Sequence, residues 1–276
     1  MTKNEIKNFI TLNAKGEVPE GILDYIASNI GSVPFISLQQ LAVETNSSIS
    51  EITDFFNTLG FDDFIEFKTY LRKTNYFERK NNQLVERDLR NIASDMMNCE
   101  LQNLTEFFGD FDYELLDRLV QDITAASEVV FLAFRGSSAY TTYAVNMFNK
   151  IGIRASFLNL RDINFTDYLN TMSRSVLIIS FGFARYNKSL VVANNVLKKN
   201  GFHLVGITDS IHSPLAALAD YSFVLPVHSV DFSDSFTAGM LLINLITFKI
   251  GMTNKDYMLK SIANYEHLSN ELDSFY

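Results

Sequence analysis

The pattern of hydrophobic and polar positions along the chain changes character near residue 126. Before that point apolar residues recur at intervals of three and four, which predicts amphipathic helices. We expect these helices at about residues 4–12, 19–29, 37–44, 48–59 and 62–72, with two more between 92 and 126. After residue 126, short apolar runs alternate with helical stretches, as in a parallel sheet with helices on its faces. The pattern predicts an all-α N-terminal domain followed by an α/β domain.

The α/β part is expected to hold a five-stranded parallel sheet flanked by helices. The apolar runs predict strands at residues 128–134, 154–159, 175–181, 203–208 and 221–226. Helical stretches lie between them at 139–151, 164–172, 187–200 and 214–219, and two more helices are expected at 232–250 and 255–272. We therefore assign residues 1–75 to the helical domain, 76–92 to a charged and polar linker, and 93–276 to the α/β domain with a helical N-terminal extension.

Two short helices of the first domain carry signals for their own start. Ser37 with Gln40, and Ser48 with Glu51, have the spacing of capping boxes, in which each side chain satisfies the other residue's backbone N–H. Gly60 follows the second helix as a C-cap. Two short capped helices joined by a tight turn are typical of a helix-turn-helix. A small helical bundle with no role in DNA binding fits the spacing equally well.

The composition of the chain excludes several classes of protein and of binding site. The chain has 276 residues and a single cysteine, Cys99, so an intramolecular disulfide and a zinc site of several thiolates are both excluded. The polar N-terminus lacks a signal-peptide core, and Asn244 interrupts the most apolar stretch, residues 238–248, before it reaches membrane-spanning length. We expect a soluble, cytoplasmic protein with no membrane partner, no metal and no cofactor.

The net charge is −9, and both parts of the chain are acidic: residues 1–80 hold 8 Lys and Arg against 11 Asp and Glu. Neither part has the positive excess that favours nonspecific binding to phosphate backbones.

Ligands of an open parallel sheet bind at the carboxyl ends of the strands. The first strand is followed by Gly136, Ser137 and Ser138 at the start of a helix, where free N–H groups suit an anion. The third strand ends at Ser180 and leads through Arg185, which can clamp an anion, to Asn187. A plain helix cap and a solvated surface arginine are the alternative interpretations of these two loops.

These residues carry a family resemblance. The second half of the chain resembles the SIS (sugar isomerase) domain, a phosphosugar-binding fold with flavodoxin-like layering, in the GSS turn at 136–138, in Ile179-Ser180, and in TDSIHSPLAALAD at 208–220. With Leu59-Gly60-Phe61, Phe64 and Glu66-Phe67-Lys68, residues 18–250 resemble an RpiR-type transcriptional regulator. The resemblance implies a helix-turn-helix that binds operator DNA, a SIS domain that senses a phosphosugar or related anionic sugar derivative, and a homodimer or homotetramer.

The expected site residues follow from the resemblance and from helical spacing. The effector-binding set is Gly136, Ser137, Ser138, Ser180, Arg185 and Asn187. The DNA-binding set is Ser48, Ser50, Thr53 and Asn57 on the second capped helix, with Lys68 and Arg72 on the next helix for phosphate contacts.

The chain departs from the family pattern at both sites. The third-strand loop of the family typically reads S-x-S-G-x-T, whereas Gly182, Phe183 and Arg185 stand here at the second serine, the glycine and the threonine. No Lys or Arg lies between Ser48 and Gly60, a segment that contains Glu51 and Asp54.

Three functions remain open at this stage. We favour a sensor over a phosphosugar isomerase, because candidates for a general base are few and no Ser-His-Asp or metal-ligand spacing is present. His212, in the loop after the fourth strand, is a possible base, whereas a histidine at the position of His228 is more often a loop residue. No catalytic residue is therefore predicted. The alternative is a SIS-domain protein that binds a sugar derivative and whose helix-turn-helix has lost DNA binding.

Overall fold

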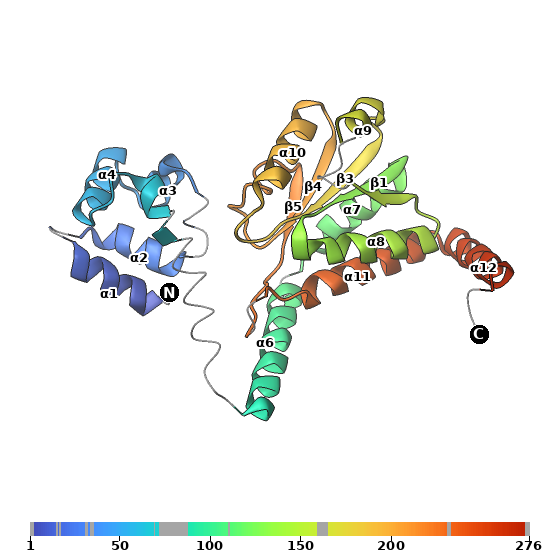
Figure 1. Ribbon diagram of the computed structural model, residues 1–276, viewed down its shortest axis with the longest axis horizontal. Coiled ribbons are helices and arrows are strands. Elements are labelled where there is room, and N and C mark those ends of the chain that lie inside the picture. Colours follow the sequence, from blue (N-terminus) through green and yellow to red (C-terminus); the bar gives the residue numbers. More distant parts are fainter. Residues whose placement is uncertain are drawn as a thin grey trace. The chain divides into compact units, whose positions relative to one another are not determined.

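The computed structural model in Figure 1 describes residues 3–14, 16, 18–30, 33, 36–68, 70–71, 88–109, 111–158, 165–230 and 233–273. The chain forms two compact units. The N-terminal unit is Met1–Met96 together with Val230–Ser233, and the C-terminal unit is Met97–Ser229 together with Asp234–Tyr276.

The N-terminal unit is helical, as predicted. Its helices are α1 (Lys3–Asn13), α2 (Glu20–Ser28), α3 (Leu38–Glu44) and α4 (Ile49–Thr58), and residues 64–68 and 70–71 are helical as well. They enclose a core of aliphatic and aromatic side chains in which Phe55, Phe56 and Phe67 are buried. Pro19, expected inside α2, instead occupies its N-cap position.

Both predicted capping boxes are confirmed. The Ser37 hydroxyl accepts from the Gln40 N–H at 3.0 Å, and the Gln40 side chain accepts from the Ser37 N–H at 2.8 Å. Ser48 and Glu51 repeat this exchange at 3.2 and 2.7 Å at the start of α4. Gly60 follows the end of α4 with a φ of +84°, a conformation that glycine adopts without the steric cost of a Cβ.

The C-terminal unit is built on a five-stranded parallel sheet. Its strands are β1 (Glu128–Leu132), β2 (Ala155–Phe157), β3 (Val176–Phe181), β4 (His203–Thr208) and β5 (Tyr221–Val224), in the order β2-β1-β3-β4-β5. All five lie within the predicted ranges.

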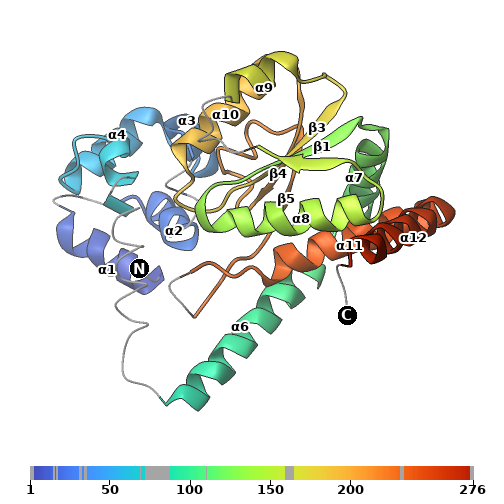
Figure 2. The ribbon, with the colours of Figure 1, turned by 45° about the vertical axis from the view of Figure 1, so that its right-hand side comes forward.

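Helices cover both faces of this sheet (Figure 1 and Figure 2). Val129 and Phe131 of β1 belong to the core under α7 (Tyr113–Ala125), α8 (Ser138–Lys150) and α11 (Thr237–Thr253). Val130 and Leu132 point to the opposite face, where α9 (Phe165–Thr171) and α10 (Lys188–Lys199) lie. This alternation follows from the two-residue period of a strand.

Two further helices complete the described part. α6 (Leu89–Gly109) begins inside the predicted linker and runs into the C-terminal unit, and α12 (Lys255–Glu271) packs on α8 and α11. The Tyr257 hydroxyl of α12 donates to the Gly152 carbonyl at 2.9 Å. No helix among the described residues is long and apolar enough to cross a membrane.

The prediction of a helix at residues 214–219 is wrong, because this segment forms consecutive turns and a bend. Ala217 and Ala219 donate to carbonyls four residues back, but the Asp220 N–H already pairs with Leu204 of β4. The entry into β5 therefore ends the helical hydrogen bonds before a helix is established.

Candidate functional site

The strand order reverses between β1 and β3, so the loops that leave the carboxyl ends of these two neighbours flank the usual ligand site of such a sheet. The β1 loop forms a 3-10 turn, η2 (Arg135–Ser137), that leads directly into α8. Ser137 makes no side-chain cap to α8, and the Thr141 hydroxyl donates to the Ser138 carbonyl at 2.8 Å. The Ser138 N–H donates to the Arg135 and Gly136 carbonyls within the 3-10 turn, and no Ser137 side chain covers the helix N-terminus that follows, a setting that suits an anion.

Two residues of the β3 loop that differ from the S-x-S-G-x-T pattern, Gly182 and Phe183, are packed into the core. A Cβ on Gly182 would lie 2.7 Å from Leu215 Cδ2 and 2.9 Å from Leu190 Cδ2, so a serine does not fit without displacing the core. Phe183 is buried and lies 5.6 Å, ring centroid to centroid, from Tyr140. Both positions therefore serve the packing of the core.

Asp209, which follows β4, accepts hydrogen bonds from two residues of the same loop. Its carboxylate accepts from the Ala184 N–H at 3.1 Å and from the Tyr186 hydroxyl at 2.5 Å. Burial raises the pKa of Asp209, although these donors favour its charged form. The Ala184 amide therefore already serves an internal carboxylate, and what the loop offers an anion is the charge of Arg185.

Arg185 and Arg135 share an unusual backbone conformation. Their φ angles are +63° and +58°, and both residues are exposed. A non-glycine residue in the left-handed region is strained, and such strain concentrates at binding sites. Sequence reasoning named Arg185 but missed Arg135. Its position directly before Gly136 was the available signal, but the conformation becomes visible only in the fold.

Two members of the predicted effector set have structural partners. The Ser180 hydroxyl is buried and donates to the Asn194 side chain at 2.7 Å. Asn187 is the N-cap of α10, and its side chain accepts from the Ser189 and Leu190 amides. We therefore do not carry Ser180 and Asn187 into the effector site. The other four members, on the two loops beside the switch point, are Gly136, Ser137, Ser138 and Arg185.

A network that sequence reasoning missed lies beside the β1 loop. The Tyr140 ring on α8 stacks on Phe181 with 4.9 Å between centroids, and its hydroxyl donates to the Ser235 carbonyl at 3.4 Å. The Ser235 hydroxyl donates to the Glu100 carboxylate of α6 at 2.5 Å. Burial, then the charges of Asp234 and Glu100, raise the pKa of Tyr140, so the phenol stays protonated and acts as a donor.

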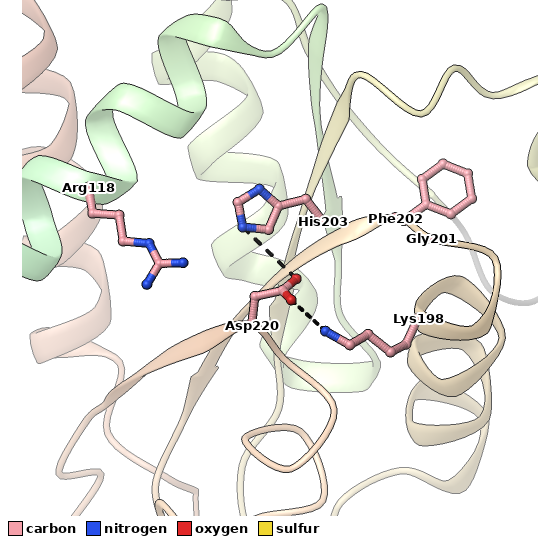
Figure 3. Close-up of a pocket in the computed structure, with 6 residues that line it drawn as sticks. All are labelled: Arg118, Lys198, Gly201, Phe202, His203 and Asp220. Atoms are coloured by element: carbon pink, nitrogen blue, oxygen red, sulfur yellow. Dashed lines mark hydrogen bonds and ion pairs between the residues drawn. The ribbon is translucent and has the colours of Figure 1, made fainter.

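A hollow lies at the amino edge of the sheet and is lined by Arg118, Lys198, Gly201, Phe202, His203 and Asp220 (Figure 3). Lys198 pairs with Asp220 at 2.5 Å, and the His203 Nε2 lies 3.7 Å from Asp122. Opposite charges are thus already paired at this edge, away from the switch point. Within the described residues, no group of three or more His, Cys, Asp or Glu side chains is placed to hold a metal.

The predicted DNA-binding residues fall into three groups. Ser50 and Asn57 are exposed on α4, as is Asp54 between them. The Ser48 hydroxyl caps α4, and the Thr53 hydroxyl donates to the Ile49 carbonyl at 2.8 Å. Lys68 donates to the Ile36 carbonyl at 3.2 Å and lies over the Phe64 ring, and Arg72 lies outside the described residues.

Comparisons with known proteins agree with this architecture. Residues 122–248 match the SIS domain family. An uncharacterized HTH-type transcriptional regulator of Clostridium perfringens is 22% identical over 207 residues, which are 72% of this chain and 73% of the relative.

Solved structures share the fold. The Vibrio vulnificus NanR protein complexed with ManNAc-6P aligns with a TM-score of 0.70 and 17% identity over 97% of this chain and 98% of its own. The sugar isomerase domain of an RpiR transcription factor from Sphaerobacter thermophilus aligns with a TM-score of 0.61 and 22% identity, over 64% of this chain and 98% of its own. Residues 122–248 thus match the SIS domain family, and the chain as a whole resembles RpiR-type transcriptional regulators in sequence and in fold.

Proposed function

We propose that this regulator senses a phosphosugar, or a related anionic sugar derivative, at the switch point between β1 and β3 and binds operator DNA through α4. The observation that carries the proposal is the occurrence of two arginines in left-handed conformation, Arg135 and Arg185, on the two loops that flank the start of α8 at one edge of the SIS sheet. Two cations and a helix N-terminus together suit a phosphate.

In this arrangement Ser137 and Ser138 bind the phosphate through hydroxyls and α8 amides, with Gly136 allowing close approach. Arg185 supplies charge where the buried Phe183 and the tight packing at Gly182 leave no room for hydroxyls. The Vibrio vulnificus protein was solved with ManNAc-6P, which makes that compound the first ligand to test.

The DNA-binding side of the proposal places α4 in the major groove. Ser50 and Asn57 are exposed on it, and an asparagine can make a bidentate contact with adenine. A helix-turn-helix commonly reads two half-sites about one helical turn apart, so we propose at least a homodimer. We place the protein in the cytoplasm with its DNA and assign it no catalytic activity.

Calorimetry with ManNAc-6P, glucosamine 6-phosphate, glucose 6-phosphate and inorganic phosphate tests the effector site. Arg185→Ala and Arg135→Ala should each weaken the bound phosphosugar by about 1.5–3 kcal/mol, roughly 10- to 150-fold, if each makes a charge-assisted hydrogen bond. Lys188→Ala, an exposed cation at the start of α10, is the matched control and should leave the affinity unchanged. Unchanged affinity in both arginine variants would remove them from the site.

A second function, a SIS-domain protein that no longer binds DNA, is favoured by one observation. Glu51 and Asp54 are the charged residues between Ser48 and Gly60, and Lys68 is engaged with Ile36 and Phe64. The exposed side of α4 therefore carries negative charge where a DNA-binding helix would meet phosphates.

Fluorescence anisotropy on upstream DNA at two salt concentrations separates the two functions. For a regulator, Asp54→Arg should strengthen nonspecific binding and steepen its salt dependence, because a further phosphate contact releases a counterion. If neither wild type nor Asp54→Arg binds at about 50 mM salt, the second function holds.

A further inference from the structure

One face of α6 is fastened to the connection between β5 and α11 by two side chains three residues apart. Asn103, fully buried, donates from Nδ2 to the His228 carbonyl at 2.7 Å and accepts from the His228 N–H at 3.2 Å. Glu100 accepts from the Ser235 hydroxyl at 2.5 Å. The two anchors therefore hold the two ends of this connection on the same helix.

α6 is also the helix through which the chain leaves the N-terminal unit. Its first residues, 89–96, belong to the N-terminal unit, whereas Glu100 and Asn103 belong to the C-terminal unit. The division between the units thus falls within this helix, one turn before Glu100. Both anchors therefore lie on the helix in which the division between the two units falls.

Ser235 also joins these anchors to the β1 loop. Its carbonyl accepts from the hydroxyl of Tyr140, which lies in the first turn of α8, two positions after Ser138. The Tyr140 ring has little freedom, because it stacks on Phe181 and packs against Phe236, each at 4.9 Å between centroids. This packing holds the Tyr140 hydroxyl beside the Ser235 carbonyl, so the start of α8 and Ser235 are joined through a closely packed ring.

We propose that the hydrogen bond from Ser235 to Glu100 is the contact that couples effector binding at the β1 loop to α6, and through α6 to DNA binding. This inference rests on the proposed function. An effector shifts a conformational equilibrium only by its differential affinity for the two states. In the proposed coupling, the Ser235–Glu100 bond is the contact that differs between the two states. It can take this role because it joins the α8 side of the site to the helix that leads to the DNA-binding unit. Asn103 acts as the fixed anchor of the same helix.

The test measures coupling separately from binding. The effector is ManNAc-6P, or the member of the phosphosugar panel that binds wild type. The Kd for upstream DNA is determined with and without saturating effector, and the Kd for the effector is determined with and without DNA. Allosteric coupling is typically 5- to 150-fold and is the same in both directions. We expect Glu100→Ala and Ser235→Ala to bring this factor to within about twofold of one, while each separate Kd changes by less than about threefold.

Two further variants make the result specific. Ser235 Oγ also accepts from the Thr237 N–H at 3.2 Å, so Ser235→Ala disturbs the start of α11, whereas Glu100→Ala leaves that bond in place. Glu100→Gln keeps an acceptor and should retain most of the coupling. Thr105→Ala removes an α6 hydroxyl that donates within the helix, to the Leu101 carbonyl, and should retain all of it.

Each outcome supports or overturns the inference. Wild-type coupling in Glu100→Ala overturns it and leaves the proposed function intact. Lost coupling in Thr105→Ala as well as Glu100→Ala also overturns it, because any change in α6 would then suffice. If wild type binds no phosphosugar or no DNA, the proposed function fails and the inference falls with it.

Discussion

At the scale of single residues, two serines near the carboxyl ends of strands have different structural settings and therefore different expected roles. Ser180 and Ser137 are both serines at carboxyl ends of strands, yet Ser180 is buried against Asn194 and Ser137 lies half-buried at the start of α8. The difference arises because Ser180 is still inside β3 and points to the face covered by α10, whereas Ser137 has already left β1.

Ser180→Ala should therefore lower stability without affecting the effector. The variant leaves the Asn194 side-chain oxygen without its donor in the core, which costs about 1–3 kcal/mol. Urea unfolding measures this loss, with Ser137→Ala as the control of nearly unchanged stability. A phosphosugar affinity that fell together with stability would return Ser180 to the binding site.

Arg185→Gly should have the opposite effects to Ser180→Ala: stability is kept and effector affinity falls. Glycine adopts a φ of +63° without a Cβ penalty, so relief of strain should keep or raise the free energy of unfolding by up to about 1 kcal/mol. The same change removes the guanidinium and should weaken the effector as Arg185→Ala does. Thermal unfolding and calorimetry on one preparation check both effects. Loss of stability would mean that contacts of the side chain, rather than the ligand, maintain this conformation.

At the scale of elements, the two capping boxes differ in charge. The box of α3 uses the neutral Gln40, whereas that of α4 uses Glu51. The Ser48 N–H, followed by the Ser48 hydroxyl, holds the pKa of Glu51 below its ordinary value. A depressed folded-state pKa contributes stability above the unfolded-state pKa and loses it as the pH falls through the folded-state value. The stability of α4 should therefore fall on acidification, and that of α3 should not.

Ser48→Ala and Ser37→Ala test this difference. At pH 7 each should cost about 1 kcal/mol, typical of a lost N-cap. At an acidic pH, where Glu51 is protonated, the cost of Ser48→Ala should shrink by the part that the Ser48 hydroxyl contributes to the stability of the Glu51 carboxylate, while the cost of Ser37→Ala should stay constant. Denaturant unfolding at the two pH values gives both numbers, and equal pH dependence would contradict the assignment.

At the scale of the whole molecule, α11 presents an apolar stripe to solvent. Leu241, Phe248 and Met252 are 41%, 66% and 68% exposed and recur at helical spacing. An exposed apolar stripe of this kind is a natural contact for a second copy, as the proposed dimer requires.

Phe248→Lys should weaken that assembly. Light scattering at micromolar concentration is expected to give a multiple of 31.4 kDa for wild type and a shift toward the single-chain mass for the variant. Val192→Lys, at an exposed apolar position on α10, should leave the mass unchanged. A monomeric wild type would contradict the prediction.

Local pattern determined the elements of this protein. Helical and strand periodicity, the two capping boxes and the positions of the five strands could all be predicted from sequence, because each depends on residues a few positions apart. The turns at 214–219 show the limit, since pairing with Leu204 overrode a local helical signal.

Only the tertiary structure decided which residues meet. Ser235 and Glu100 are 135 positions apart, and Tyr186 and Asp209 are 23 apart, so no local spacing predicts either contact. The same holds for the conformation of Arg135 and for the packing that excludes a hydroxyl at Gly182. These features depend on how strands and helices fill space around one another, a property that appears only once the sheet has assembled.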